Sequence, residues 1–220
     1  MLNLPASAAF ERRIPKQKFY TNLTVTPELR RCFTEQIESI TWADKLAPQT
    51  MNLAAGQRVQ EIEVFRIRLA GDTLDGKVTE LMDKQIPYHI LFVLTRPDGM
   101  LRLLMNYKEA APGGGFTLRQ RCATGWLAPD TVCLPLLAAD MDALYEGFVR
   151  YIAGDSLQSA AGEDLAQSVQ RTEMLNQLQR QIDRLTTKMK REKQLPRQLE
   201  LRRQIKKLQQ EMQGCLRGRS

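Results

Sequence analysis

The sequence is poor in histidine and cysteine, and it has no apolar run long enough to span a bilayer. Its 220 residues include one histidine and four scattered cysteines with no C-x-x-C pair. This pattern supports neither a zinc site nor a disulfide framework, so we expect no metal, no cofactor and a reducing compartment. The first residues also lack the apolar segment of a signal peptide, and no stretch approaches eighteen apolar residues. We therefore expect a cytoplasmic protein without a membrane segment.

Signatures of catalysis are equally scarce. The glycine run 113–115 is not followed by the Gly-Lys-Ser/Thr of a phosphate-binding loop, and no serine or cysteine nucleophile motif is present. His89 begins a strongly apolar stretch, where a lone histidine is more often a packed core residue than a catalytic one. These absences favour a protein without chemistry of its own.

A metal-dependent nuclease is the enzymatic alternative. Glu61 and Glu63 fall on one face of a predicted strand, and Asp83 follows on the next predicted helix. Such a nuclease needs carboxylates and a lysine gathered at one end of a sheet, so this reading takes Glu61, Glu63, Asp83 and His89 as its site. Nucleases of the restriction-enzyme type carry Glu-x-Lys on a strand, whereas this chain offers only Lys108-Glu109, in the reverse order.

Hydrophobic periodicity predicts a globular domain over residues 1–153. The expected elements are helix, strand, helix, strand, strand, strand and helix, over 26–40, 59–69, 72–85, 88–94, 100–107, 116–126 and 139–152. The strand at 59–69 alternates with charge, which predicts one solvated face. Residues 14–22 are expected to be extended and 42–56 to form a loop. The order predicts a small α/β or α+β domain with a mixed sheet, in which 59–94 forms a parallel crossover.

The tail, residues 171–214, has the heptad pattern of a helical coiled coil. A linker at 154–170 precedes it, and 215–220 form a short end. The heptad register breaks around Pro196, which predicts two helices, about 172–193 and 196–213, in a hairpin; a single kinked helix is the alternative. The seam residues are Leu175, Leu178, Ile182, Leu185, Met189, Leu201, Ile205, Leu208 and Met212.

The basic charge of the protein is concentrated in the same tail. Residues 171–220 hold fourteen Lys and Arg against five Asp and Glu, whereas residues 1–170 hold eighteen against twenty. Cations alone are enough for salt-sensitive binding to phosphates, although a solvated helical face is the simpler interpretation. The candidate nucleic-acid contacts are Lys188, Lys190, Arg191, Lys193, Arg197, Arg202, Arg203, Lys206 and Lys207.

Four further stretches carry a resemblance. They are Ile14–Tyr20, Ile40–Trp42 with Lys45–Pro48, Ile86–Phe92 and Lys190–Arg197. Together they resemble an uncharacterised bacterial family, a domain of unknown function, whose members are encoded beside Swi/Snf-type helicases and DNA methyltransferases in restriction and phage-defence islands. The resemblance implies an accessory protein of a DNA-processing complex.

Three functions follow as hypotheses. The first is a non-enzymatic accessory subunit that docks a helicase or a DNA methyltransferase and contacts DNA through its basic tail. The second is the metal-dependent nuclease described above. The third is a homodimeric coiled-coil scaffold without nucleic acid, because an apolar seam can pair with a second copy as well as within one chain.

Overall fold

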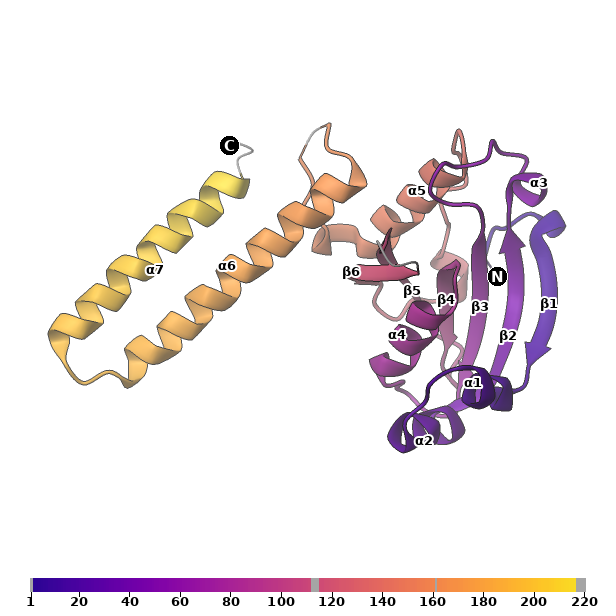
Figure 1. The fold of residues 1–220 in the computed structure, drawn as a ribbon, viewed down its shortest axis with the longest axis horizontal. Helices are drawn as coiled ribbons and strands as arrows, with labels where there is room; N and C mark the ends of the chain where they lie inside the picture. Colours follow the sequence, from indigo (N-terminus) through magenta and orange to yellow (C-terminus); the bar gives the residue numbers. More distant parts are fainter. Residues whose placement is uncertain (1, 112–114, 161, 217–220) are drawn as a thin grey trace. The chain divides into compact units, whose positions relative to one another are not determined.

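The chain forms two compact units, Met1–Gly154 and Asp155–Ser220. The computed structural model describes residues 2–111, 115–160 and 162–216. Most of the expected glycine loop and the last four residues of the expected tail therefore lie outside the described residues. The first unit holds a β-sheet with its helices, and the second holds two long helices (Figure 1).

The sheet has six strands that lie side by side in the order of the sequence. All neighbouring strands are antiparallel except β3 and β4, which run parallel and are joined through helix α4 (Gly76–Gln85). The expected mixed sheet and its parallel crossover are thus confirmed. The strands are β1 (Ala9–Ile14), β2 (Ile37–Leu46), β3 (Ile62–Leu69), β4 (His89–Thr95), β5 (Leu101–Ala110) and β6 (Phe116–Ala123).

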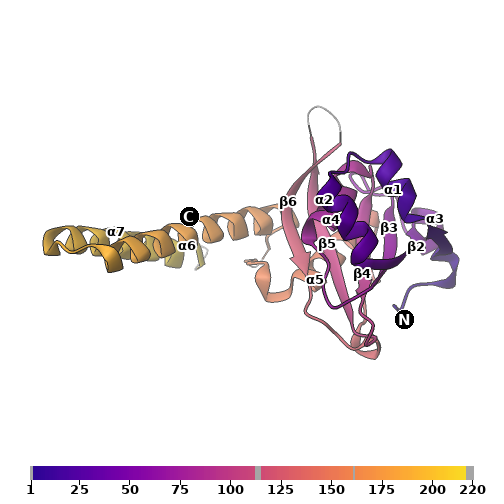
Figure 2. The same ribbon diagram turned by 90° about the horizontal axis from the view of Figure 1, so that it is seen from below.

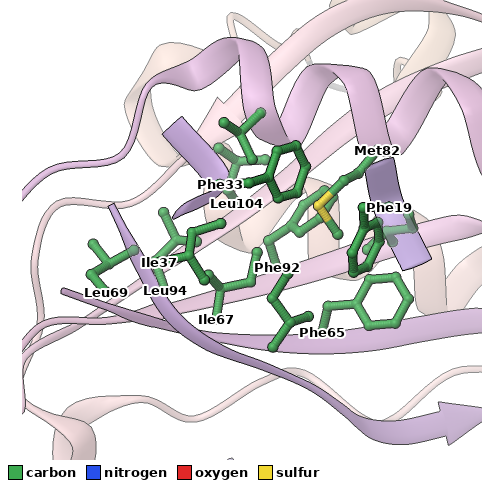
Figure 3. Close-up of a cluster of buried hydrophobic side chains, with 13 residues drawn as sticks. Phe19, Phe33, Ile37, Phe65, Ile67, Leu69, Met82, Phe92, Leu94 and Leu104 are labelled. Atoms are coloured by element: carbon green, nitrogen blue, oxygen red, sulfur yellow. The ribbon is translucent and has the colours of Figure 1, made fainter. Parts of the chain in front are cut away.

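The main hydrophobic core lies between one face of this sheet and three helices. Helices α1 (Lys16–Asn22), α2 (Pro27–Glu35) and α4 supply Phe19, Phe33, Val78 and Met82 to it. Alternate residues of the central strands complete the cluster (Figure 3), because side chains in a strand point to the two faces in turn. They are Ile37, Ile40, Phe65, Ile67, Leu69, Ile90, Phe92, Leu94 and Leu104.

Helix α5 (Met141–Ala153) covers part of the opposite face. Ile90 belongs to the main core, so its neighbour His89 points to the other side of the sheet, where its ring lies 4.3 Å from that of Tyr145 on α5. Helix α5 packs on β5 and β6, as the two ribbon views also show (Figures 1 and 2). The short helix α3 (Pro48–Met51) and the 3-10 turns Ala6–Ala8, Pro129–Thr131 and Gly154–Ser156 complete the set.

The N-terminal third differs most from the sequence-based expectation. Thr26 does cap helix α2, but that helix ends at Glu35, and Ile37 and Ile40 are buried on strand β2 instead. Their spacing of three fits a helix face, but the pairing of β2 with β1 and β3 decides for a strand. The predicted loop at 42–56 begins with this strand, and the stretch predicted to be extended contains α1.

Strand β3 does not have the solvated face that its charged residues suggest. It lies between β2 and β4, and six of its eight residues are buried, including the charged Glu63. The prediction was wrong because alternation of charge marks a half-exposed strand only when one face is left uncovered, and here both faces are covered.

The second unit is an antiparallel helical hairpin of α6 (Leu165–Arg191) and α7 (Leu195–Leu216) (Figure 1). All nine predicted seam residues are buried or half-buried. At the far end, Arg171 donates to the Cys215 carbonyl, which confirms the antiparallel pairing. Helix α6 begins inside the expected linker because Asp164 and Gln167 form a capping box at its start.

The hairpin turn works without the glycine or asparagine that usually ends such helices. Glu192 caps α6 in an extended conformation, so no left-handed residue is needed. Its carboxylate accepts from the backbone N–H of Lys193 at 2.8 Å and of Gln194 at 3.0 Å. The hydrogen bond from Gln194 is the main reason why the pKa of Glu192 lies below its usual value. Gln198 closes the turn by donating from Nε2 to the Glu192 carbonyl.

Among the described residues, no helix is both long enough and apolar enough to cross a membrane. The longest, α6 and α7, are interrupted by charged residues throughout.

Gly56 provides a test of this fold. A Cβ at Gly56 would lie 2.5 Å from Oδ1 of Asp142 and 2.6 Å from the Val59 carbonyl. The Asp142 carboxylate accepts from three backbone N–H groups of residues 57–59, so it cannot move without losing them. We expect Gly56→Ala to lower the free energy of unfolding by about 1–3 kcal/mol.

The measurement is denaturant unfolding followed by tryptophan fluorescence, since both tryptophans lie in the first unit. Gly71→Ala is the control, because a Cβ there meets nothing within 4 Å. Equal effects of the two substitutions would contradict the packing described around Asp142.

Candidate functional site

A cavity of about 230 Å³ lies on the side of the sheet covered by α1. Its lining is mainly aliphatic and aromatic, and Glu63 of β3 is the one acidic residue in it. Small-molecule sites in proteins are typically apolar hollows with a few placed polar groups, and this cavity has that character at a small size. The lining residues are Ile14, Lys18, Phe19, Asn22, Leu23, Trp42, Glu63, Phe65, Ile86 and Tyr88.

The Glu63 carboxyl group is held at this cavity by Trp42. The indole Nε1 of Trp42 donates to Glu63 Oε2 at 2.6 Å, which fixes the orientation of the carboxyl group. Only 1% of Glu63 is exposed, and its Oε1 accepts no hydrogen bond from a donor group of the described residues. A buried acceptor without a donor is costly, so this oxygen is the unmet polar demand of the cavity.

Burial raises the pKa of Glu63 to about 7. The negative charge of the nearby Glu61 adds to this effect, while the Trp42 hydrogen bond and the charge of Lys45 act against it. Lys45 itself pairs with Glu61, with 2.8 Å between Nζ and Oε2. Strand β3 therefore presents two neighbouring carboxyl groups, one paired with a lysine and one kept close to its point of ionisation at neutral pH.

Three of the four stretches that carry the family resemblance meet at this cavity. The first supplies Ile14, Lys18 and Phe19, the second supplies Trp42, and the third supplies Ile86 and Tyr88. These segments are far apart in the sequence, and the sheet brings them together around Glu63.

A second polar cluster lies inside the protein, at the end of α4. Lys108 of β5 and Asp83 of α4 form an ion pair with 2.6 Å between Nζ and Oδ1, and both side chains are 0% exposed. Asn106 donates to the other carboxylate oxygen at 2.6 Å. Burial raises the pKa of Asp83 and lowers that of Lys108, while their mutual attraction opposes both shifts.

The same ammonium group fixes a wall of the cavity. Lys108 Nζ also donates to the backbone carbonyls of Asp83 at 3.1 Å and Tyr88 at 2.5 Å. It thereby ties down both ends of the segment 83–88, which contributes Ile86 and Tyr88 to the cavity. The ion pair is sealed from solvent, so its role is to position the segment.

His89 is packed between aromatic rings on the α5 side of the sheet. Its ring lies 4.3 Å from that of Tyr145 and 5.1 Å from that of Phe116. Burial, helped by the charge of Lys108, lowers the pKa of His89 to about 3. The imidazole is therefore neutral at physiological pH and does not face the Glu63 cavity.

The four residues of the nuclease alternative are not gathered at one place. Glu61 and Glu63 are neighbours, whereas Asp83 is engaged by Lys108 and Asn106, and His89 lies on the opposite face of the sheet. Within the part of the chain that the structure describes, no group of three or more acidic, histidine or cysteine side chains is arranged to hold a metal ion.

The basic residues of the hairpin are all exposed. Each of the nine predicted contacts is solvent-accessible, and in the described part of the chain none of them forms a salt bridge. On α7, Arg202 with Lys206 and Arg203 with Lys207 stand four residues apart, which places them in two rows along the helix. The hairpin thus offers cations to solvent while its apolar seam is closed.

A family model described as a domain of unknown function, DUF4391, matches residues 2–212. The chain belongs to this family. No curated protein and no solved structure matches the chain. The DUF4391 match spans both units, so the sheet domain and the hairpin together make up the family's domain.

Two residues that shape the DUF4391 sheet domain were not recognised from sequence. Trp42 was expected at the start of a loop, and nothing in its surroundings indicates that it would orient Glu63. Lys108 carried a usable signal, because strand alternation puts it on the same face as Leu104 and Asn106, and Leu104 is a core residue.

The Asp83–Lys108 pair can be tested by a double-mutant cycle. Asp83→Asn and Lys108→Met should each lower the free energy of unfolding by about 3–5 kcal/mol, because each leaves the other group buried without its partner. The double substitution should cost less than the sum by about 2 kcal/mol or more. Tryptophan fluorescence in denaturant gives all four values, and additive losses would show that the two groups do not interact.

Glu63 should make stability depend on pH. Its pKa is raised in the folded protein, so its contribution is fully present below about pH 4.5 and is lost as the pH rises through 7. We expect Glu63→Gln to gain on the wild type by on the order of 2 kcal/mol between pH 4.5 and 8.

The measurement compares unfolding free energies of the two proteins across that pH range. Glu35→Gln, which changes an exposed carboxyl group on α2, is the control and should show no such drift. A constant difference between Glu63→Gln and the wild type would show that Glu63 is not held in its neutral form.

Proposed function

We propose that this DUF4391 protein is a non-enzymatic accessory subunit of a bacterial DNA-processing complex, of the restriction or phage-defence kind. In this proposal the α6–α7 hairpin contacts nucleic acid, and the sheet domain docks a helicase or DNA methyltransferase partner. The choice of partner rests on the family resemblance, and the choice of ligand rests on the hairpin.

The observation that carries the nucleic-acid part is the state of the nine hairpin cations. They are exposed, they form no salt bridges among the described residues, and only two acidic residues, Glu192 and Glu200, lie among them. The carboxylate of Glu192 is already engaged by the turn. Unneutralised cations on a rigid helical arm attract phosphates and release counterions on binding, without reading sequence.

The closed seam supports an arm of this kind over a coiled-coil dimer. Leu175, Ile182, Leu201 and Ile205 are buried within the single chain, so the strongest apolar surface of the hairpin is already used. A second copy would have to open the hairpin to pair through the same residues. Binding through the remaining exposed surface is therefore expected to be mainly electrostatic.

The test is a titration of labelled duplex DNA at several salt concentrations. One variant replaces Arg202, Arg203, Lys206 and Lys207 of α7 by glutamine, which keeps helix propensity and removes four positive charges. We expect the slope of log Kobs against log salt to become shallower by about 3 to 4, with at least about tenfold weaker binding at low salt.

The control variant carries the same charge change in the first unit, by glutamine at the exposed residues Arg13, Arg31, Lys77 and Arg121. It should bind DNA nearly as the wild type does. If both variants lose affinity equally, net charge is responsible and the hairpin is not the contact. Unchanged binding by the α7 variant would exclude these four cations.

A further inference from the structure

The Glu63 cavity has three features that point to a ligand. Its walls include the aromatic rings of Phe19, Trp42 and Tyr88. It contains a carboxyl oxygen, Glu63 Oε1, that is buried and receives no hydrogen bond from a donor of the described residues. Lys18 also lines it, and this residue is otherwise exposed to solvent.

Each feature restricts the chemistry of the occupant. Aromatic walls favour a flat ring that can stack. The acceptor oxygen of Glu63 requires an N–H donor on the edge of that ring, because an unpaired buried acceptor would otherwise remain. The ammonium group of Lys18 suits a phosphate attached to the ring, and it disfavours a cationic occupant such as a guanidinium group.

The size of the cavity narrows the choice further. Drug-sized ligands occupy pockets of about 300–1,000 Å³, and this cavity of about 230 Å³ is smaller. It has room for one ring system, with sugar and phosphate left outside.

We propose that this cavity binds one nucleobase that carries an exocyclic amine, with the amine donating to Glu63 Oε1. Cytosine, adenine and guanine meet this condition, whereas uracil and hypoxanthine present a carbonyl or a hydrogen at the corresponding position. Trp42 holds the carboxyl group through its other oxygen and offers a ring for stacking. The proposal concerns the first unit only and is independent of DNA binding by the hairpin.

The nucleobase comes either from a free nucleotide or from an unpaired position in a strand. Both sources share the ring and its amine, and both place a phosphate outside the cavity. An unpaired nucleotide in a strand would bring further phosphates, so it would bind more tightly and with more salt dependence than the monomer.

The experiment uses the full chain with Trp126→Phe, which leaves Trp42 as its only tryptophan. Trp42 fluorescence then reports stacking in the cavity directly. The protein is titrated at pH 8, where Glu63 is mainly ionised, with two matched pairs of nucleotides, CMP with UMP and GMP with IMP. Each pair differs only at the exocyclic amine. The expected result is quenching by CMP or GMP, with at least about tenfold weaker binding of UMP or IMP.

Glu63→Gln is the decisive variant. It keeps the shape of the side chain and an oxygen for the Trp42 bond, but it replaces the free acceptor by an amide N–H₂. Its binding of CMP and GMP should fall at least about tenfold, and its preference within each pair should vanish or reverse. Glu35→Gln, on the exposed face of α2, should leave both properties unchanged.

The source of the base is separated with oligonucleotides, using the chain that also carries the four α7 substitutions so that the hairpin is silenced. Tighter binding of a duplex with one bulged cytosine than of the fully paired duplex or CMP assigns the cavity to strands. Binding of CMP alone assigns it to free nucleotides. Either outcome supports the proposal, and CMP binding by this variant persists even if the hairpin has no role in DNA binding.

Three results would overturn the proposal. The first is the lack of any nucleotide binding with Kd below about 1 mM. The second is equal binding within each matched pair, or wild-type affinity of the Glu63→Gln variant. The third is quenching by methylguanidinium and not by nucleotides, which would assign the cavity to a cationic side chain of a partner protein.

Discussion

The ammonium group of Lys108 joins three parts of the sheet domain that the chain itself separates. It pairs with the Asp83 carboxylate, and it donates to the Asp83 and Tyr88 carbonyls on either side of the connection from α4 to β4. A charge buried to this extent is tolerated only when such partners surround it. This interaction therefore holds the end of the parallel crossover in one geometry, and with it the Tyr88 wall of the Glu63 cavity.

The two faces of the sheet follow from that crossover. Because β3 and β4 run parallel, α4 must pass over the sheet, and it packs there with α1 and α2 on the face that carries Phe65 and Phe92. The opposite face receives α5 and encloses His89. Glu63 lies on the first face, at the end of β3 where the three helices leave a gap, which is why a charged residue of a central strand can border a cavity.

The protein thus presents two different polar surfaces for two kinds of contact. The hairpin offers exposed charges on a rigid support, suited to long-range, salt-dependent attraction. The cavity offers one buried carboxyl group among aromatic rings, suited to short-range recognition of a flat, polar-edged group. Glu63 and the hairpin cations differ in burial, and burial determines which kind of interaction each can make.

Much of the fold was predictable from local sequence. The seam from Leu175 to Met212, the break at Pro196 and the elements between β3 and α5 all follow from hydrophobic period and turn chemistry, which depend on near neighbours. The concentration of charge in the tail is likewise visible in composition alone. The tertiary structure decided the rest. Ile37 and Ile40 became strand residues because β1 and β3 pair with them from both sides. Trp42 orients Glu63, and Lys108 secures Tyr88, only because the sheet brings segments 20 or more residues apart into contact. Such contacts have no period in the sequence, since they depend on strand order and on which face each strand covers.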